Sequence, residues 1–330
     1  CVPRVDEIVR MTEGKYYALL DLTNAFSQIR VHPDSQKYTA INTPWGCFEW
    51  TIMPQGLCNS PSTWLKLINK YMTGLVGEIL KIYVDDAVVY GAKTIQQHLD
   101  NLRRVLRAFR EAKVLVNPFK STLFSTNINI VGHEISEQGL GIDKKKVQTL
   151  MDWPRPSNKK SVQRFMGFVN FLRKFMKNLA EPARVLTNLT KKNIPFKWTN
   201  TEEEAFQQIK EIAKNTPILK NIDYKSGEPI WLIADASATG IGATLAQGPD
   251  WKTAHPIAFE SRGFQGKPNT GEWLYVVHDA ELLAVINALK KWEPLLLGTK
   301  FTICTDHDSL KYLHTKPRLT PMQHRWVEYL

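Results

Sequence analysis

The sequence predicts a mixed α/β (α+β) protein of more than one domain. Short β-prone runs alternate with longer stretches in which apolar residues recur at helical spacing. Across the first part of the chain the order is strand, helix, strand, strand, helix, strand, which is the order of a ferredoxin-like sheet. The length of 330 residues allows two or three domains, and 43% hydrophobic residues with 10 Trp suffice for buried cores.

The strongest local signal is a pair of acids between two apolar runs. Residues 79–84 and 87–90 are β-prone and flank Asp85 and Asp86, so the stretch predicts a hairpin that carries carboxylates at its bend. An ordinary exposed turn is the commoner explanation of an Asp pair, because Asp favours turns. Hairpins built only for folding, however, prefer Asn-Gly or Asp-Gly at the turn. Two adjacent carboxylates are like charges side by side, so we expect a cation to bind beside them. A pair of Mg²⁺ ions fills that role where carboxylates serve phosphate chemistry.

The other elements of this part follow from local patterns. Residues 16–22 form a dense β-prone run with Asp21 near its end, and a buried carboxylate there is costly unless it is paired or bound to a metal. Residues 38–51 alternate β-branched and aromatic residues around a Pro/Gly turn, which predicts a hairpin. Apolar spacing predicts helices over residues 62–72 and 94–112.

The composition limits the kinds of binding partner and the cellular compartment that we expect for this chain. The chain has 43 Lys and Arg against 32 Asp and Glu, a formal net charge of +11, which suits a polyanionic partner, although solubility alone also explains it. Four cysteines without zinc-type spacing favour free thiols in a reducing, intracellular compartment. No apolar stretch reaches the roughly 18 residues of a membrane span and no signal-peptide pattern opens the chain, so no membrane partner is expected. Because the chain begins with Cys1, we expect it to be a fragment.

From Gly139 onward the sequence becomes rich in Lys and Arg interleaved with aromatic residues. Charge runs are mostly solvated helix faces, but here Phe165, Phe168, Phe171 and Phe175 recur at spacings of three and four. This pattern predicts an apolar stripe, mostly core, beside a basic one. Basic residues placed in this way contact backbone phosphates without reading the base sequence.

Three acidic residues in the last part of the chain lie at the ends of predicted strands or on a predicted helix. Asp235 and Asp306 each end a predicted strand, and Glu281 lies on a helix predicted over residues 273–292. Any one of them alone would be unremarkable. Acids at two strand ends and on the intervening helix can converge, and we therefore expect a second acidic cluster.

Five motifs in the first 138 residues match one family in the same order. They are Leu20-Asp21-Leu22-Thr23-Asn24-Ala25-Phe26, Met53-Pro54-Gln55-Gly56-Leu57-Cys58-Asn59-Ser60-Pro61, Tyr83-Val84-Asp85-Asp86, Asn117-Pro118-Phe119-Lys120 and Val131-Gly132-His133-Glu134-Ile135. The set resembles the reverse transcriptases, in which the third motif is the catalytic hairpin. The resemblance implies a right-hand polymerase palm, ferredoxin-like, with partial fingers.

The resemblance also implies roles for individual residues. Asp21, Asp85 and Asp86 would hold two Mg²⁺ ions, with Mn²⁺ as a substitute, and Asp86 would contribute least directly. Phe26 would lie against the sugar of the incoming nucleotide, although a core position is the commoner fate of a Phe. A solvated side chain is nearly as good an explanation for Lys120 as a role at the leaving group. The remaining expectations are nucleotide contacts by Gln55, Gly56 and Lys120, and nucleic-acid contacts by Tyr83, Gly132, His133, Arg164, Arg173 and Lys174.

The rest of the chain resembles the polyproteins of Gypsy-class (Metaviridae) LTR retrotransposons. Residues 153–175 are similar to their helical thumb, and residues 196–199 with a helix over 202–219 are similar to their connecting segment. Three further motifs resemble their ribonuclease H domain: Ala234-Asp235-Ala236-Ser237, Ala280-Glu281-Leu282-Leu283-Ala284 and Thr305-Asp306-His307-Asp308-Ser309-Leu310. This resemblance implies that Asp235, Glu281 and Asp306 bind metals that activate water against the RNA strand of a hybrid.

These matches predict four segments. Partial fingers and palm occupy residues 1–138, the thumb 139–194, the connecting segment 195–228, and a C-terminally truncated ribonuclease H-like domain 229–330. The family's finger strands and its fourth ribonuclease H carboxylate are expected to lie outside the chain. We therefore expect weak catalysis from this fragment alone.

The predicted function is that of an RNA-directed DNA polymerase with an attached ribonuclease H. The expected partners are an RNA template, a DNA primer, their RNA–DNA hybrid and deoxynucleoside triphosphates. The protease and integrase segments of a parent polyprotein are expected alongside, in a cytoplasmic virus-like particle. The alternative is a decayed or host-retained element that binds nucleic acid without turnover, and the intact carboxylates of both clusters weigh against it.

Overall fold

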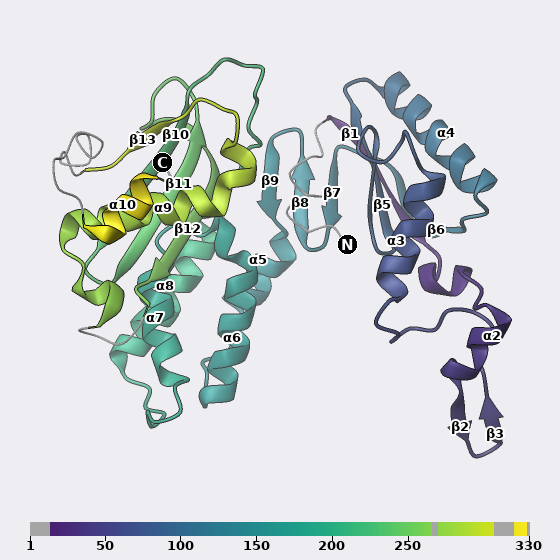
Figure 1. Cartoon of the computed structure of the whole chain (residues 1–330), viewed down its shortest axis with the longest axis horizontal. Helices are drawn as coiled ribbons and strands as arrows, with labels where there is room; N and C mark the ends of the chain where they lie inside the picture. Colours follow the sequence, from purple (N-terminus) through teal and green to yellow (C-terminus); the bar gives the residue numbers. More distant parts are fainter. Residues whose placement is uncertain (1–13, 266–269, 307–319, 329–330) are drawn as a thin grey trace. The chain divides into compact units, whose positions relative to one another are not determined.

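The chain folds into two compact units, divided between Leu140 and Gly141. The structure, a computed structural model, describes residues 14–265, 270–306 and 320–328 (Figure 1). Among the described helices, none is both long and apolar enough to span a membrane. The domain boundary expected after residue 138 lies beside the observed division, and the boundaries expected within the second unit remain predictions.

The first unit is built on a four-stranded antiparallel sheet with the order β4-β5-β1-β6. In chain order its strands are β1 (Tyr16–Leu22), β4 (Leu80–Tyr83), β5 (Asp86–Ala92) and β6 (Val116–Ser125). Two helices, α3 (Ser60–Tyr71) and α4 (Ile95–Glu111), interrupt them at the expected places. The expected order of strand, helix, strand, strand, helix, strand is therefore confirmed, with a ferredoxin-like arrangement.

Helices α3 and α4 cover the same face of the sheet. Trp64 and Ile68 from α3 and Val105 and Phe109 from α4 lie in one buried cluster with Leu20 of β1. Successive residues of a strand point to opposite faces, so the residues between the core positions, Asp21 and Asp86 among them, lie on the face away from the helices. The uncovered face therefore carries the acids of the first predicted cluster.

Smaller elements complete the first unit. A short α2 (Pro33–Gln36) precedes the predicted hairpin of β2 (Ile41–Thr43) and β3 (Gly46–Phe48), whose aromatic residues are largely exposed. After β6, a second sheet has the order β7-β8-β9, formed by β7 (Asn127–Ile130), β8 (His133–Ser136) and β9 (Gly139–Ile142).

The second unit begins with helices. These are α5 (Lys144–Met151), α6 (Lys159–Leu172), the one-turn η3 (Arg173–Phe175), α7 (Ala180–Leu189) and α8 (Asn200–Lys214). Within the predicted aromatic stripe, Phe165 and Phe175 are fully buried, but Phe171 is 37% exposed. The prediction that most of the stripe is core therefore holds for its two ends and fails at Phe171.

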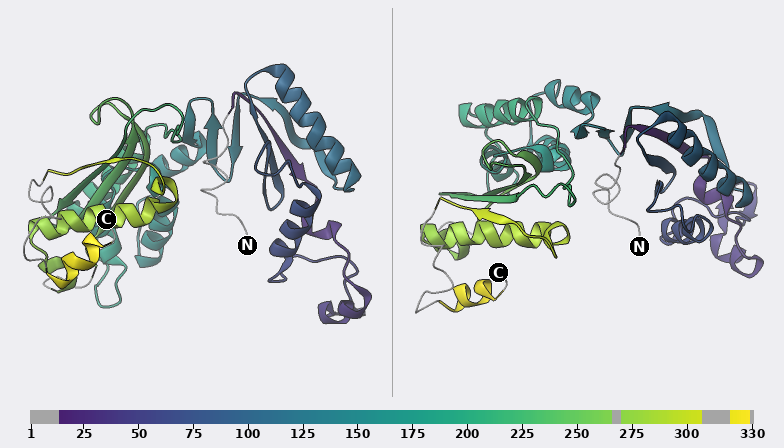
Figure 2. Two further views of the ribbon diagram at one scale, coloured as in Figure 1. Left: turned by 45° about the horizontal axis from the view of Figure 1, so that its top comes forward. Right: turned by 90° about the horizontal axis from the view of Figure 1, so that it is seen from above.

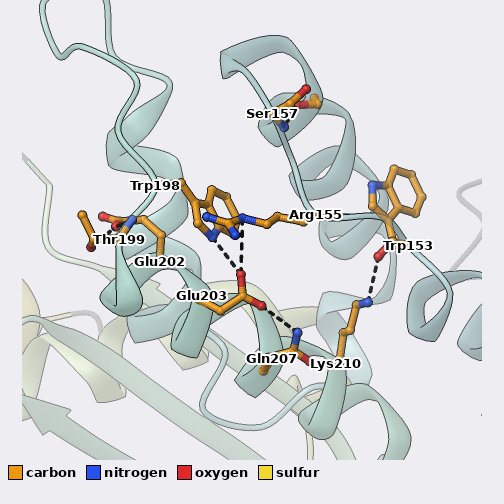
Figure 3. A network of polar contacts seen from close by, with 10 residues as sticks. Trp153, Arg155, Ser157, Trp198, Thr199, Glu202, Glu203, Gln207 and Lys210 are labelled. Carbon is orange, nitrogen blue, oxygen red and sulfur yellow. Dashed lines mark hydrogen bonds and ion pairs between the residues drawn. The ribbon is translucent and has the colours of Figure 1, made fainter.

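A buried lysine and a half-buried carboxylate tie these helices together (Figure 3). Lys210 of α8 donates from Nζ to the carbonyl oxygens of Met151 and Trp153, at 2.8 Å each, and so caps the end of α5. Glu203 accepts from the indole N–H of Trp198 at 2.8 Å and pairs with Arg155 at 3.6 Å. Burial lowers the pKa of Lys210, but the two carbonyls hold its ammonium group in place.

The rest of the second unit is a four-stranded sheet with the order β12-β11-β10-β13. Its strands are β10 (Ile230–Ser237), β11 (Gly240–Gln247), β12 (His255–Gly263) and β13 (Thr302–Cys304); β13 runs parallel to β10, and the other pairs are antiparallel. The long α9 (Val277–Leu296) packs on one face, and α7 contacts β11 and β12 on the other (Figure 2). The helix predicted over residues 273–292 begins four residues later, because Gly271–Leu274 form a 3-10 turn. The described part ends with α10 (Pro321–Val327).

Candidate active sites

The first acidic cluster lies at the turn between β4 and β5. Tyr83 and Asp86 are register partners, so Val84 and Asp85 form the two-residue bend and Asp86 opens β5. This corrects the expectation that both acids lie at the bend. Val84 has φ of +54°, a left-handed conformation that is strained for a β-branched residue. The backbone therefore places the two carboxylates in different settings, with Asp85 exposed and Asp86 half-buried.

An indole from α3 holds this strained turn. Trp64 is fully buried, and its Nε1 donates to the carbonyl oxygen of Val84 at 2.5 Å. The Leu22 amide donates to the carbonyl oxygen of Asp85 at 2.7 Å and ties the turn to β1. These two bonds fix the backbone on both sides of the bend. The sequence predicts a helix around Trp64, but nothing local to Trp64 indicates a partner twenty residues away.

Asp21 completes the cluster from the neighbouring strand. It is the register partner of Asp86, and directly opposed residues of an antiparallel pair hold their Cβ atoms about 5 Å apart on one face. Burial, followed by the charges of Asp85 and Asp21, raises the pKa of Asp86 to about 6. The crowding of three carboxylates thus carries an electrostatic cost that a bound cation would offset.

The segment that carries Lys120 bulges out of β6 beside Asp21. Leu19 pairs with Thr122 but Asp21 pairs with Asn117, so several residues of β6 are left outside the register. Pro118 contributes to this, because it has no N–H for the sheet. The Asn117 side chain accepts from the amide of Lys120 at 3.3 Å, and the Lys120 side chain is exposed. The structure thus brings Lys120 to the neighbourhood of the cluster without a fixed contact to it.

The expected nucleotide-binding residues lie in two other loops of the first unit. Phe26 is half-buried in a 3-10 turn after β1 and packs against the buried core of the first unit. Gln55 and Gly56 are exposed in the loop before α3, and Gly56 has φ of +101°, which favours glycine. These positions leave both explanations of Phe26 in place, since the ring contacts the core and still has an exposed part.

The residues expected to contact nucleic acid differ in exposure. Arg164 is exposed on α6, whereas Tyr83, Gly132, Arg173 and Lys174 are half-buried. His133 is an exception, because its ring is 2% exposed and its Nδ1 lies 3.1 Å from the carbonyl oxygen of Val131. Val131 and Gly132 both have positive φ and form the two-residue turn of the β7–β8 hairpin, as in a type I′ turn. A buried ring presents no surface to a nucleic acid, so the structure gives His133 a packing role at this turn.

The second acidic cluster joins three elements of the second unit. Carboxylate oxygens of Asp235 on β10, Glu281 on α9 and Asp306 after β13 all lie within 4.8 Å of one another. Parallel pairing of β10 with β13 brings the two strand ends together. Glu281 is 1% exposed, and its carboxylate accepts from the Ala236 amide at 2.8 Å and from the Thr305 hydroxyl at 3.3 Å. The expected convergence is therefore observed, while His307 and Asp308 of the same motif lie outside the described residues.

Electrostatics make this cluster suitable for a cation. Burial raises the pKa of Glu281, and the charges of Asp306 and Asp235 raise it further, against the lowering effect of the Ala236 amide. Three converging carboxylates offer only oxygen donors, which hard divalent cations prefer to softer metals. The same donor chemistry holds for Asp21, Asp85 and Asp86. Among the described residues, the close convergence of carboxylates that one divalent cation needs is found at Asp235, Glu281 and Asp306.

Comparison with known proteins places these clusters in a family. A family model described as reverse transcriptase (RNA-dependent DNA polymerase) matches residues 3–170, which are 168 of the 330 residues. The chain belongs to the reverse transcriptase family. A second model, described as an RNase H-like domain found in reverse transcriptase, matches residues 225–330 and contains the whole second cluster.

Relatives of this chain include transposon polyproteins of Schizosaccharomyces pombe. The chain is 30% identical over 312 residues to the Transposon Tf2-3 polyprotein of Schizosaccharomyces pombe, and 29% identical to the Tf2-7 polyprotein. Both alignments cover 94% of this chain but 23% of the relative, so the chain spans about a quarter of the length of these relatives. The resemblance to Gypsy-class polyproteins is confirmed.

Solved structures agree with the fold of this chain. Foamy viral protease-reverse transcriptase in complex with double-stranded DNA aligns with a TM-score of 0.85 and 25% identity, covering 99% of this chain and 67% of that one. The dRH form of the same viral protein, also with double-stranded DNA, gives a TM-score of 0.85 and 25% identity, covering 98% and 56%. The expected α/β class with polymerase and ribonuclease H-like parts is confirmed.

Proposed function

We propose that the chain carries the catalytic centres of an RNA-directed DNA polymerase and of a ribonuclease that cleaves RNA in RNA–DNA hybrids. The observation that carries the proposal is the meeting of Asp21 with Asp85 and Asp86 at a hairpin of a reverse transcriptase palm. The second cluster of Asp235, Glu281 and Asp306 supports the ribonuclease activity.

The residues of the palm would bind and orient the reacting groups. Asp21, Asp85 and, less directly, Asp86 would hold two Mg²⁺ ions, with Mn²⁺ as a substitute. Such ions lower the pKa of a hydroxyl nucleophile and stabilise charge on the attacking and leaving oxygens of a phosphoryl transfer. Trp64 and Leu22 keep the two acids of the hairpin in position through the backbone, and the exposed Lys120 supplies positive charge beside them.

In the second cluster, Glu281 has the most fixed position. Its carboxylate accepts hydrogen bonds from the Ala236 amide and the Thr305 hydroxyl, and lies close to the carboxylates of Asp235 and Asp306. Asp235 and Asp306 are exposed, so a substrate phosphate and water can approach from their side. We propose two Mg²⁺ ions at this cluster as well.

The proposed partners are those of a reverse transcriptase: an RNA template, a DNA primer, the hybrid they form and deoxynucleoside triphosphates. The double-stranded DNA bound by the foamy viral relatives supports a duplex partner. The polyprotein relatives support further segments such as a protease and an integrase in the parent protein, and we propose a cytoplasmic virus-like particle as its location. The net charge of +11 favours polyanions.

The test is primer extension on matched RNA and DNA templates, with the chain extended to the natural ends of its parent protein. Extension on both templates that requires Mg²⁺ or Mn²⁺ is expected. Hybrid cleavage is measured in the same preparation with labelled RNA. A folded protein that binds hybrid but neither extends a primer nor cuts RNA would favour the decayed, non-catalytic alternative.

The position of Phe26 gives a test of nucleotide selection. If its ring lies against the sugar, Phe26→Val should admit ribonucleotides, because the smaller side chain leaves room for a 2′-hydroxyl. The change also deletes half-buried volume, so thermal stability is measured alongside. Unchanged discrimination in a folded, active variant would assign Phe26 to the core alone.

A further inference from the structure

A basic cavity of about 490 Å³ lies in the second unit between α7 and the edge strand β12. Its lining includes four cationic side chains and one acidic one: Arg173, Arg184, Lys191, Arg262 and Glu260. Ser261 lines it as well. It shares no residue with the acidic cluster of Asp235, Glu281 and Asp306, so it is a separate site.

Two polar groups at this cavity are buried without a partner. Ser261 is 5% exposed, and its Oγ has no hydrogen-bond partner among the described residues. The Nε of Arg184 is also buried and has no hydrogen-bond partner among the described residues. Buried polar groups of folded proteins are nearly always paired, so an unpaired hydroxyl and an unpaired guanidinium N–H beside one cavity indicate a missing hydrogen-bond acceptor.

The other charges of the cavity are already engaged. Arg262 pairs with Glu272 at 2.7 Å, and Glu260 pairs with Lys291 of α9 at 3.6 Å. Arg173 donates to the carbonyl oxygen of Ser261 at 2.7 Å and to the Asn170 side chain. Its burial lowers the pKa of its guanidinium, while the charge of Glu260 raises it.

Two cations therefore remain uncompensated. Neither the Arg184 guanidinium nor the Lys191 ammonium has an acidic partner within 4 Å in the described part of the chain. The cavity thus combines surplus positive charge with buried hydrogen-bond donors, which is the environment that an oxyanion requires.

We propose that this cavity binds a phosphate group, with Arg184, Lys191 and Ser261 as its ligands. Arginine offers a planar fork that suits phosphate oxygens, lysine adds a point charge, and the serine hydroxyl donates one further bond. The volume falls within the range of roughly 300–1,000 Å³ typical of ligand sites and leaves room for the sugar that carries the phosphate. A backbone phosphate of an RNA–DNA hybrid fits this chemistry, and that source rests on the proposed function; free pyrophosphate shares it.

The test compares two neighbouring lysines. Lys191→Gln and Lys192→Gln remove the same charge from the same segment, but only Lys191 lines the cavity. Hybrid binding is measured by fluorescence anisotropy between 50 and 200 mM KCl. The slope of log affinity against log salt concentration depends on the number of phosphate contacts. Lys191→Gln is expected to weaken binding on the order of fivefold and to lower the salt slope by about 1, and Lys192→Gln to leave the slope unchanged.

Ser261→Ala and a pyrophosphate titration complete the experiment. Ser261→Ala removes a hydroxyl that has no partner in the free protein, so it should leave the melting temperature unchanged and still weaken phosphate binding. Loss of hybrid affinity in Lys191→Gln and Ser261→Ala identifies a strand phosphate. Loss of pyrophosphate binding by calorimetry, with hybrid binding unchanged, identifies a free anion instead.

The proposal is overturned if Lys191→Gln and Lys192→Gln behave alike toward both ligands. That outcome is independent of catalysis, because primer extension and hybrid cleavage are read separately in the same preparations. Conversely, a chain extended to the natural ends of its parent protein that is inactive but binds pyrophosphate through Lys191 would refute the proposed function and retain the phosphate site.

Discussion

In the palm, Asp85 and Asp86 are neighbours in sequence and only Asp21 comes from another strand, whereas Asp235, Glu281 and Asp306 come from three separate elements. The palm acids are exposed or half-buried at a strained turn. The central acid of the other cluster is buried and held by a backbone amide. The first cluster therefore depends on the local geometry of one hairpin, and the second on the packing of a helix against a sheet.

The difference matters for how each cluster fails. A change at the palm turn alters the direction of two carboxylates but removes little buried contact. A change at Glu281 leaves the Ala236 amide without its acceptor inside the domain. We expect palm variants to lose activity with little loss of stability, and Glu281 variants that remove the acceptor of the Ala236 amide to lose both.

The largest expected effect separates the two clusters by their reactions. Asp85→Asn should lower primer extension by more than about 100-fold and leave hybrid cleavage unchanged, and Asp235→Asn should do the reverse. Loss of an outer partner of a metal ligand alone costs 10–100-fold, so loss of a ligand costs more. Single-turnover rates of both reactions are measured for each variant. Asp100→Asn, an exposed acid on α4, is the control, and equal loss of both reactions in one variant would contradict the separation.

The next effect concerns stability at the second cluster. Glu281→Ala should destabilise its domain by about 1–3 kcal/mol, because it leaves a buried backbone donor unpaired. Glu281→Gln keeps an acceptor for the Ala236 amide and should retain most of the stability while losing hybrid cleavage. Urea unfolding without divalent ions measures both. If Glu281→Ala were as stable as Asp85→Ala, the second cluster would not depend on the packing of its helix more than the palm cluster does, and the contrast would be wrong.

A third effect tests the support of the palm turn. Trp64→Phe keeps a buried ring but removes the N–H that binds the Val84 carbonyl, and should cost about 0.5–1.5 kcal/mol, or up to tenfold in the rate of extension. Adding Val84→Gly should recover part of the loss, since glycine adopts φ of +54° without strain. Trp45→Phe on the exposed β2–β3 turn is the matched control. Equal rates in Trp64→Phe and wild type would remove Trp64 from the positioning of the acids.

The smallest expected effect is the pH dependence of the palm cluster without divalent ions. The pKa of Asp86 is about 6 in the fold against 3.8 for the ordinary group, so the folded state binds the proton more tightly. The stability from this protonation is present below about pH 4 and is lost as pH rises to about 6. Asp86→Asn should therefore match wild type at pH 4 and exceed it above pH 6, by at most about 1 kcal/mol after solvent screening.

Thermal unfolding at pH 4, 5, 6 and 7 checks this window. Mg²⁺ should reduce the advantage of Asp86→Asn at pH 7, because a bound cation offsets the repulsion among the wild-type carboxylates. Asp100→Asn serves again as the control. A constant difference across the pH range would show that Asp86 does not titrate as described.

Local patterns were enough to predict the elements of the palm. Periodicity located α3 and α4 to within two residues, and the two apolar runs around Asp85 and Asp86 located the hairpin. Strand ends and the intervening helix also predicted that Asp235, Glu281 and Asp306 could converge, as the structure shows. These features depend on residues close in sequence or on strand ends that any such fold brings together.

Other features were decided only by the tertiary structure. Asp86 belongs to a strand rather than the bend because its pairing with Asp21 fixes the register, and His133 is buried because its hairpin turns it inward. The bond from Trp64 to Val84 joins a helix to a turn that it meets only after folding. The basic cavity unites α7 with β12, far apart in the chain. Sequence patterns report on spacing along the chain, whereas register, burial and the partners of a polar atom are set by the simultaneous packing of all elements.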